Sequence, residues 1–330
     1  MKSKIHTATL LFALAASSFS SAQLSQADSL KKVVVNTKTD TVKVNAYNKL
    51  ADHFKQSHPD SVAFYAQKAA ALSSKIDYGF GLANAALNNG NFHILTGKYA
   101  LALADFKKAQ TTFEKLLSQN PEDKALKNGL ARAFASSGIV YSEESNYYMA
   151  LENYEKALNY YREIGQKTNI SKALNNIGIV YKAQQNYPKA LEFLKNAFQI
   201  QNEIGEQNAP VTLTNIGVIY FETKKYAEAL QYYHKAEDAF KKTDNKRGVA
   251  LLYNYLGDYY SKQNDLSAAA DYYQKSLDLY ENMQHKFGAS LALYNIGRLF
   301  TDQKKYTEAM PYALKSLGYV KEIGVLDQTY

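Results

Sequence analysis

The chain of 330 residues contains no cysteine. A protein without cysteine forms no disulfide bond and offers no thiolate ligand to a metal ion. The sequence therefore excludes disulfide-stapled scaffolds and thiolate metal centres.

Motifs that carry catalysis or nucleotide binding are also missing. Gly79-Phe80-Gly81 lacks the third glycine of a dinucleotide-binding loop, and no phosphate-binding Gly-Lys-Ser/Thr motif occurs. Glu143-Glu144 is an isolated acidic pair, which we interpret as solvated rather than as an acid–base dyad. The histidines after the first residues are scattered, and none has the i, i+4 spacing of a helical metal pair: His53, His58, His93, His234 and His285. We therefore expect no enzymatic activity, no cofactor and no bound metal.

A repeat of about 40 residues is what the sequence does contain, from about Ala46 to Val320. Its clearest copy runs from Ser171 to Gly205. The copies align on one small anchor residue, which recurs every 39 or 40 residues except for one step of 48. The anchors are Ala51, Gly90, Gly138, Gly178, Gly217, Gly257 and Gly297. A fixed period of this size predicts a solenoid of stacked supersecondary units.

Small residues at two further positions support this register. Twelve residues after the anchors stand Ala63, Ala102, Ala150, Ala190, Ala229, Ala269 and Ala309, and nineteen residues after them stand Ala70, Ala109, Ala157, Ala197, Ala236, Ser276 and Ser316. Small side chains are required where two helix backbones approach closely, because added volume is costly in a dense core. Around the anchor, apolar residues such as Leu174, Ile177 and Tyr181 lie three and four residues apart, on one helical face. Each copy is therefore predicted to be a helical hairpin.

The segments GIVY and YPKALEFLKNA, with their counterparts in the other copies, resemble the tetratricopeptide repeat family in its long variant. The resemblance departs from the family pattern at Ala51, which replaces the anchor glycine, and at His93, which replaces the tyrosine. It implies an all-α solenoid, a right-handed superhelix of about seven helix-turn-helix repeats covering residues 45–324.

Residues 1–22 have the pattern of a secretory signal peptide. Lys2 and Lys4 precede the apolar run Ala8–Ala16, and small residues end at Ala22. The run is shorter than the ~20 residues that cross a bilayer, so we expect cleavage after Ala22 and export of a mature protein without a membrane span. The net charge of +8 then falls to +6 by loss of the two lysines, and export argues against a nucleic-acid partner.

Three further segments lie outside the regular repeat. Residues 23–44 are expected to be a weakly ordered leader, with Val33-Val34-Val35 as a strand fragment or extended segment. The long step adds eight residues between Phe113 and Leu130, where Asn120-Pro121 predicts a helix start and a longer helix or an added turn. Residues 325–330 are interpreted as the start of an unfinished eighth repeat or a stub.

The candidate ligand-binding residues follow from the resemblance, which implies that the first helix of each repeat lines the concave surface. Asparagines recur two and three residues before the anchors: Asn48, Asn88, Asn175, Asn176, Asn215, Asn254 and Asn295. An amide donates and accepts hydrogen bonds, so this ladder could hold the backbone of an extended peptide. The alternative is that asparagine merely tolerates a wet helix face. Lys172, Lys182, Arg132 and Arg298 are expected near the same surface, where they could receive carboxylates.

These features leave three functional hypotheses open. The first is an exported, non-enzymatic module that binds a peptide or protein segment in its groove. The second is the sensory region of a truncated membrane signalling protein, of the histidine kinase or transcriptional-regulator type. The third is the non-catalytic part of an enzyme.

Overall fold

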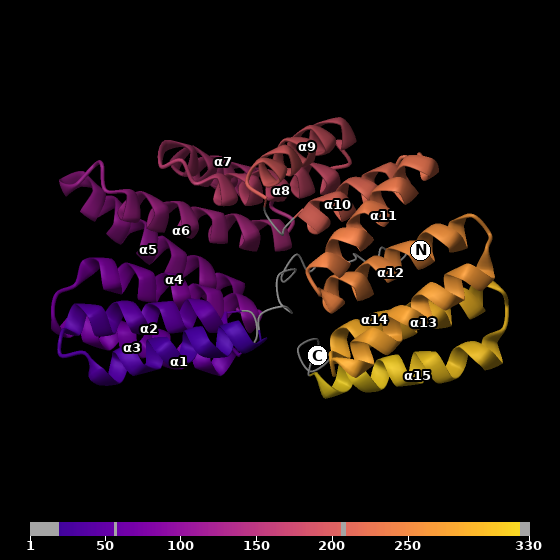
Figure 1. Ribbon diagram of the computed structural model, residues 1–330, viewed down its shortest axis with the longest axis horizontal. Coiled ribbons are helices and arrows are strands. Elements are labelled where there is room, and N and C mark those ends of the chain that lie inside the picture. The colour runs from indigo at the N-terminus through magenta and orange to yellow at the C-terminus, as the bar shows by residue number, and fades with distance from the viewer. Residues whose placement is uncertain (1–19, 56–57, 206–208, 324–330) are drawn as a thin grey trace. The chain divides into compact units, whose positions relative to one another are not determined.

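The computed structural model describes residues 20–55, 58–205 and 209–323, which form fifteen helices and no strand (Figure 1). The predicted all-α solenoid of helical repeats is confirmed. The helices are α1 (Ser20–Asn36), α2 (Asp40–Phe54), α3 (Pro59–Lys75), α4 (Gly79–Leu95), α5 (Tyr99–Gln119), α6 (Lys124–Glu143), α7 (Tyr147–Glu163), α8 (Lys167–Ala183), α9 (Tyr187–Glu203), α10 (Ala209–Glu222), α11 (Tyr226–Lys242), α12 (Lys246–Lys262), α13 (Leu266–Asn282), α14 (Lys286–Asp302) and α15 (Tyr306–Glu322).

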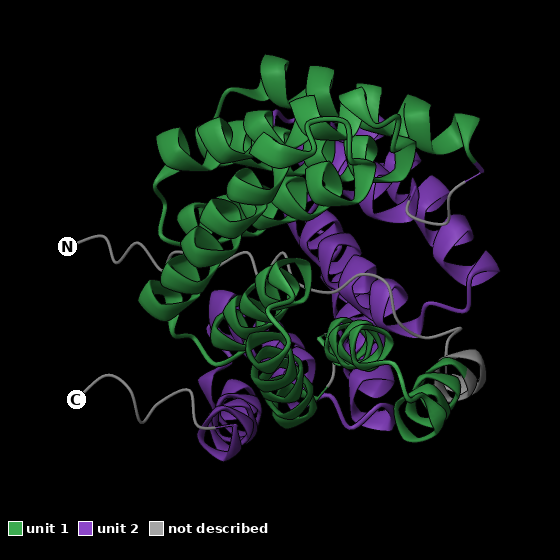
Figure 2. Cartoon of the chain, turned by 90° about the vertical axis from the view of Figure 1, so that its left-hand side faces the viewer, with its two compact units in different colours: residues 1–13, 19–204 green, residues 14–18, 205–330 purple. Residues whose placement is uncertain are grey.

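The helices belong to two compact units (Figure 2). Unit 1 contains α1–α9 and unit 2 contains α10–α15. From α2 onward each even-numbered helix, here called an A helix, forms a hairpin with the odd-numbered B helix that follows it. Within each unit an A helix also contacts the next A helix, whereas the B helices of the described chain do not contact one another. The A helices therefore form the inner surface of each unit.

The anchor glycines lie where an A helix meets its own B helix. A Cβ atom added to Gly138 would lie 2.8 Å from the ring of Tyr154, and one added to Gly257 would lie 2.4 Å from the ring of Tyr273. Only glycine allows the ring this approach. The alanines of the second to sixth repeats have no exposed surface, as predicted: Ala102, Ala109, Ala150, Ala157, Ala190, Ala197, Ala229, Ala236 and Ala269.

The first repeat departs from this register. The prediction placed Ala63 and Ala70 at the close contacts, but both are partly exposed. Val62, Ala66 and Ala69 are fully buried instead. Helix α3 begins at Pro59, eight residues after the anchor Ala51, whereas the other B helices begin nine residues after theirs. One residue fewer in the turn shifts the buried face by one position.

The predicted weak order of residues 23–44 is wrong, because α1 and the first turn of α2 occupy this segment. Ala27 is buried, and Leu30 and Val34 are partly buried. Their spacing of three and four residues makes one face of a helix, and α1 packs on α2. Val33-Val34-Val35 therefore form part of a helix and not an extended segment, because Val34 shares a face with Ala27 and Leu30.

The eight extra residues of the long step lengthen two helices. Helix α5 has 21 residues and α6 has 20, against 17 in most others. Asp123, rather than Asn120, caps α6: its carboxylate accepts hydrogen bonds from the backbone N–H groups of Ala125 (2.7 Å) and Leu126 (3.1 Å). The insertion thus lengthens the end of one hairpin and the start of the next, on both sides of the turn between α5 and α6.

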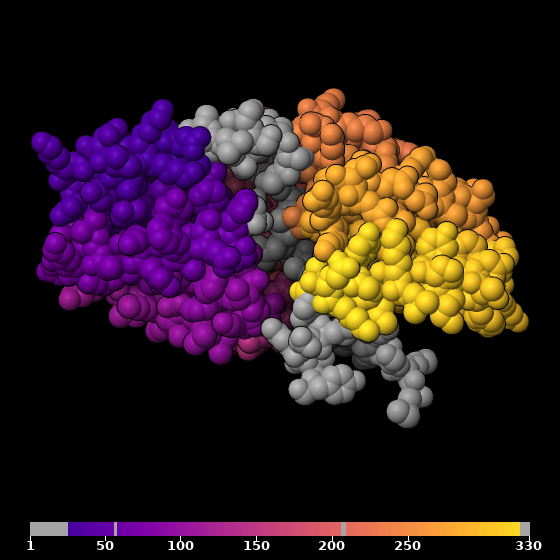
Figure 3. Space-filling view, turned by 90° about the horizontal axis from the view of Figure 1, so that it is seen from below, coloured from indigo at the N-terminus to yellow at the C-terminus, as the bar shows by residue number. Residues whose placement is uncertain are grey.

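The B helix α15, yellow in Figure 3, carries an exposed apolar stripe of Met310, Leu314 and Leu317. Leu314 is 60 % exposed. The equivalent position of the five preceding B helices holds exposed polar residues: Lys107, Glu155, Lys195, His234 and Gln274. The outer face of α15 therefore differs in character from those of the other B helices.

The signal peptide predicted for residues 1–22 lies outside the described chain, except for Ser20–Ala22 at the start of α1. The segment 325–330 also lies outside it. None of the helices in the described ranges combines the length and the apolar character needed to cross a bilayer.

Candidate functional site

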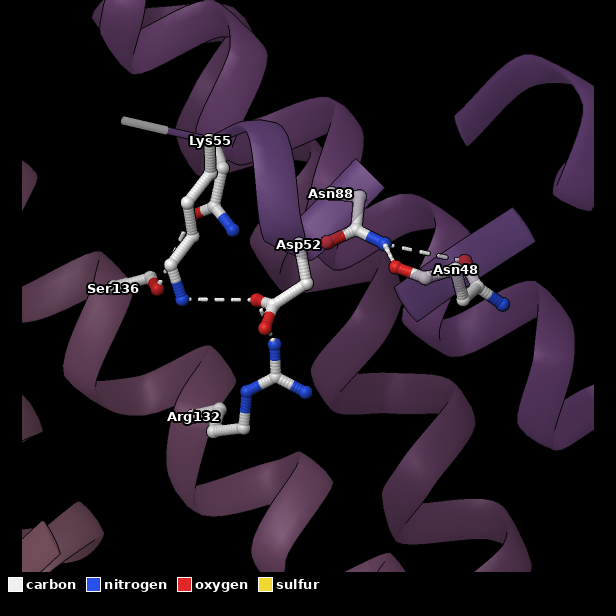
Figure 4. Close-up of polar contacts among 7 residues, drawn as sticks. Asn48, Asp52, Lys55, Asn88, Arg132 and Ser136 are labelled. Atoms are coloured by element: carbon white, nitrogen blue, oxygen red, sulfur yellow. Dashed lines mark hydrogen bonds and ion pairs between the residues drawn. The ribbon is translucent and has the colours of Figure 1, made fainter. Parts of the chain in front are cut away.

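The asparagines predicted to line the inner surface connect neighbouring A helices. In unit 1 the amide nitrogen of Asn88 on α4 donates to the backbone oxygen (3.0 Å) and side-chain oxygen (3.2 Å) of Asn48 on α2 (Figure 4). Asn48 in turn donates to the backbone oxygen of Gly81 (2.9 Å). In unit 2 Asn295 on α14 donates to Asn254 on α12 (3.2 Å). The amides therefore join successive repeats.

Burial separates the seven asparagines into two groups. Asn48, Asn88, Asn175, Asn254 and Asn295 are buried, whereas Asn176 and Asn215 are partly exposed. Asn88 Oδ1 and Asn254 Nδ2 have no hydrogen-bond partner within the described residues. Of the predicted ladder, only Asn176 and Asn215 present appreciable side-chain surface to a ligand, and binding by these residues stays a prediction.

Arg132, expected to receive a ligand carboxylate, is paired within unit 1. Its guanidinium on α6 donates to Asp52 Oδ1 on α2 (2.7 Å), and Lys55 also donates to this oxygen (2.9 Å; Figure 4). Burial by itself would raise the pKa of Asp52, but the two cations outweigh it and hold the pKa below its ordinary value. The pair joins the first and third A helices.

Arg298 is paired in a similar way in unit 2. Its guanidinium on α14 donates to Asp258 Oδ1 on α12 (2.5 Å) and to the hydroxyl of Tyr273 on α13 (3.2 Å). The Tyr273 hydroxyl donates to the same Asp258 oxygen (2.7 Å). Acid, phenol and guanidinium therefore form a closed triad at the inner surface. The remaining predicted cations lie on α8, where Lys172 is exposed and Lys182 is partly buried.

A small polar pocket on the inner side of α6 and α8 is lined by side chains whose hydrogen-bonding groups are not paired with other described residues. It has a volume of about 30 Å³ and is lined by Ile139, Ser142, Glu143, Tyr154 and Asn176. Tyr154 is only 3 % exposed. The pocket's four polar side chains form no hydrogen bond or ion pair with another described residue. They belong to Ser142, Glu143, Tyr154 and Asn176. We call these four side chains and Ile139 the Glu143 pocket.

The pair Glu143-Glu144 was expected to be solvated; Glu144 is exposed as expected, whereas Glu143 is only partly exposed. Its side chain is partly buried against α7 and α8, and burial raises the pKa of the carboxyl group. Burial and the nearby Glu143 carboxylate both raise the pKa of the Tyr154 phenol. Tyr154 was not among the predicted site residues, although it stands sixteen residues after the anchor and its ring packs on Gly138, beside the pocket that Glu143 lines.

A larger pocket of about 380 Å³ lies between α7, α8 and α9 and contains none of the predicted residues. Its walls include Arg162, Lys167, Ile170 and Leu174. Lys167 donates to Glu203 (3.2 Å). In the described ranges no group of three histidine or acidic residues is placed to hold a metal ion.

Solved structures with a similar fold are numerous. The chain superposes on the apo form of RapI with a TM-score of 0.67 and 17 % identity, over 85 % of this chain and 98 % of that one. A Rap protein complexed with Competence and Sporulation Factor gives 0.68 and 16 %, over 90 % and 80 %. A signal-transduction ATPase with a tetratricopeptide repeat sensor from Pyrococcus horikoshii gives 0.61 and 16 %, over 92 % and 48 %. At these identities the likeness shows the fold alone.

Comparison of sequences gives the family. No curated protein matches the chain. One tetratricopeptide repeat family model matches residues 130–203 and 208–282, and a second matches residues 94–140 and 255–318. Together the matches extend over most of the hairpins described above, and the chain belongs to the tetratricopeptide repeat family.

Proposed function

We propose that this protein is an exported interaction module that binds a peptide or protein segment on the inner surface of unit 1. Repeat scaffolds of this family serve protein–protein interaction, and similar folds include a Rap protein solved with Competence and Sporulation Factor. The inner surface is the natural ligand face, because the A helices expose there the side chains that hairpin packing does not use.

The observation that carries the proposal is the Glu143 pocket. At other places on the inner surface polar side chains pair with one another, as in Asp52–Arg132, Asn48–Asn88 and Asp258–Arg298. Around Glu143 four polar side chains lie together without such partners. Burying polar groups without partners costs free energy, so a site of this kind is more useful for holding a ligand than for stabilising the fold.

The experiment is affinity capture from an envelope extract, with bound proteins identified by mass spectrometry. The inner-surface variant carries Asn176→Ala, the candidate amide of unit 1 that is partly exposed. The matched control carries Glu155→Ala on the outer side of α7, where the side chain is exposed. We expect partners that the wild type and the control retain and the inner-surface variant loses.

Equal recovery of every partner by all three proteins would remove the inner surface as the binding site. Far-UV circular dichroism of each variant ensures that a loss of binding does not reflect unfolding. A partner lost only from the Glu155→Ala control would instead assign binding to the outer side.

Export is the second part of the proposal. A cut after Ala22 would remove the first three residues of α1 and leave Ala27, Leu30 and Val34, the face that packs on α2. N-terminal sequencing of the protein from its native host should therefore begin at Gln23. A protein that retains Met1 and stays in the cytoplasm would contradict export.

A sensory role is the alternative, favoured by the fold similarity to an ATPase whose tetratricopeptide repeats are described as a sensor. Reading the gene beyond Tyr330 tests it. An in-frame membrane helix followed by a kinase or DNA-binding domain would support the sensor, and a stop codon directly after Tyr330 would support the free-standing module.

A further inference from the structure

A tyrosine stands sixteen residues after the anchor glycine in three repeats, at Tyr154, Tyr233 and Tyr273. The site of Tyr154 lacks a component that the site of Tyr273 supplies. Tyr154 in unit 1 and Tyr273 in unit 2 both stand sixteen residues after their anchors, Gly138 and Gly257. Each ring packs against its anchor glycine. Each phenol therefore passes its own A helix and reaches the inner surface of its unit.

In unit 2 the phenol finds both an acid and a cation. Asp258, one residue after the anchor, accepts from the Tyr273 hydroxyl, and Arg298 from the next A helix donates to both groups. A carboxylate and a phenol oxygen together make a binding site for a cationic nitrogen donor, since each accepts a hydrogen bond and the carboxylate supplies charge.

In unit 1 the acid is present and the cation is not. Ile139 occupies the position of Asp258, and the acid is Glu143, one helical turn further along α6. The next A helix contributes Asn176 to the wall, and Ile179 stands at the position of Arg298. Glu143 forms no ion pair with any described residue, although burial already works against its charge.

We infer that the Glu143 pocket binds a primary ammonium group, presented by a lysine side chain or a free N-terminus of the bound segment. The inference rests on the proposed function and names the chemistry of its ligand. Glu143 supplies the countercharge, and the oxygens of Ser142, Tyr154 and Asn176 accept hydrogen bonds from the ammonium protons.

The chemistry of the pocket favours an ammonium group. Its volume of about 30 Å³ is above the roughly 10–15 Å³ that one water molecule requires, so a compact charged group fits. An ammonium group can donate three hydrogen bonds in different directions, whereas a guanidinium donates from a fixed planar fork. Ile139 on the wall provides an apolar contact for the methylene stem next to the ammonium.

The test uses the whole chain labelled with ¹⁵N and four small probes. Nα-acetyl-lysine N-methylamide carries the side-chain ammonium, and lysine methylamide acetylated at Nε carries only a free α-amine. The fully acetylated lysine and the norleucine analogue carry neither. We expect the first two to shift the Asn176 side-chain amide and the Ser142 and Glu143 backbone resonances, and the last two to bind at least tenfold more weakly.

The matched variants are Glu143→Gln and Glu144→Gln, which remove the same charge from adjacent residues. Glu144 is exposed and does not line the pocket. We expect Glu143→Gln to weaken binding of the lysine probe at least fivefold and Glu144→Gln to leave it within twofold.

Two results would overturn the inference: equal binding of the lysine and norleucine probes, or unchanged lysine affinity in Glu143→Gln. The probe experiment tests the ammonium ligand and affinity capture tests the proposed function, so either result can be negative without the other. Capture that depends on Asn176 without any response to the ammonium probes would keep the proposed function and remove the ammonium. Binding of the ammonium probes without capture of any partner on the inner surface would keep the ammonium site and remove the proposed function.

Discussion

Gly257 and Gly297 hold the same repeat position in unit 2 but have different surroundings. A Cβ atom on Gly257 would lie 2.4 Å from the Tyr273 ring, whereas one on Gly297 would have its nearest neighbours at 3.6 Å. Ala313 stands where the other repeat has Tyr273, so the space beside Gly297 is open. The same repeat position therefore requires glycine in one repeat and tolerates a methyl group in the next.

The two glycines should respond to alanine with opposite signs. Gly257→Ala should lower the free energy of unfolding by about 1–3 kcal/mol through overpacking against the ring. Gly297→Ala should raise it by up to about 1 kcal/mol, because alanine favours the helix. Urea unfolding monitored by circular dichroism measures both, and a similar destabilisation of the two variants would contradict the explanation.

Asp52 predicts a pH dependence for unit 1. Because Arg132 and Lys55 outweigh burial and depress its pKa in the folded state, the unfolded state binds the proton more tightly. The carboxylate therefore stabilises the fold above its ordinary pKa of about 4, and this contribution disappears as the pH falls through the folded-state pKa. The side chains of Asp52 and Arg132 are both partly exposed, so solvent weakens their attraction and the contribution to the free energy of unfolding is small.

Asp52→Asn should lower the free energy of unfolding by about 0.5–1 kcal/mol at pH 7. The difference from wild type should shrink as the pH falls through the folded-state pKa, below which Asp52 is neutral in both states of the wild type. Denaturant titrations at several pH values provide the measurement. A difference that stays constant or grows on acidification would show that Asp52 acts through packing.

At the scale of helices, one aromatic contact joins A to B in five hairpins. The residue three after the anchor stacks on one in the B helix: Phe54 on Tyr65, Tyr181 on Phe193, Tyr220 on Tyr232, Tyr260 on Tyr272 and Phe300 on Tyr312, with ring centroids 5.2–5.9 Å apart. In the second hairpin the equivalent positions hold His93 and Asp105, joined by a hydrogen bond of 2.9 Å. A polar pair there replaces an apolar stack.

Restoring the stack should stabilise the second hairpin. We expect His93→Tyr combined with Asp105→Phe to raise the free energy of unfolding by about 1 kcal/mol, from the area buried and the ring contact. Burial raises the pKa of Asp105 more than His93 lowers it, so its charge does not favour folding. Each single variant serves as a control, and the double variant should exceed their sum by about 0.5 kcal/mol or more, because the residues touch. Additive effects would mean that the rings do not meet.

At the scale of the molecule, each unit has its own core. One hydrophobic cluster extends from Ala83 on α4 to Ala197 on α9, all within unit 1, and another extends from Ala250 to Leu299 within unit 2. The stability of a repeat array is approximately a sum over repeats and the interfaces between neighbours. Neither cluster depends on residues of the other unit.

Unit 1 should therefore fold by itself. A chain of residues 23–204 is expected to show the far-UV circular dichroism of a helical protein and a cooperative urea transition. Its slope with denaturant should be smaller than that of the whole chain, since less surface is exposed on unfolding. A non-cooperative transition or loss of helical signal would show that unit 1 requires unit 2.

The sequence by itself determined the repeat. A period near 40 residues and alanines such as Ala190 and Ala197 predicted the hairpins and their buried contacts, because helix periodicity and small-residue spacing are local properties of the chain. The predicted burial of Ala63 was wrong because the turn before α3 is one residue shorter. The predicted weak order of residues 23–44 was wrong because Ala27 and Val34 lie on one apolar face of α1.

Which polar groups of the inner surface are already paired depends on tertiary packing and could not be predicted from the sequence. Asn88 donates a hydrogen bond to Asn48, 40 residues earlier, and Arg132 donates one to Asp52, 80 residues earlier. Glu143 and Tyr154, by contrast, line one pocket without a hydrogen bond to each other. Partners of this kind come from different repeats, and the curvature and register of the stacked A helices bring them together or keep them apart. The spacing of residues along the chain contains no information on this curvature or register. The sequence therefore predicted the binding surface but not the Glu143 pocket.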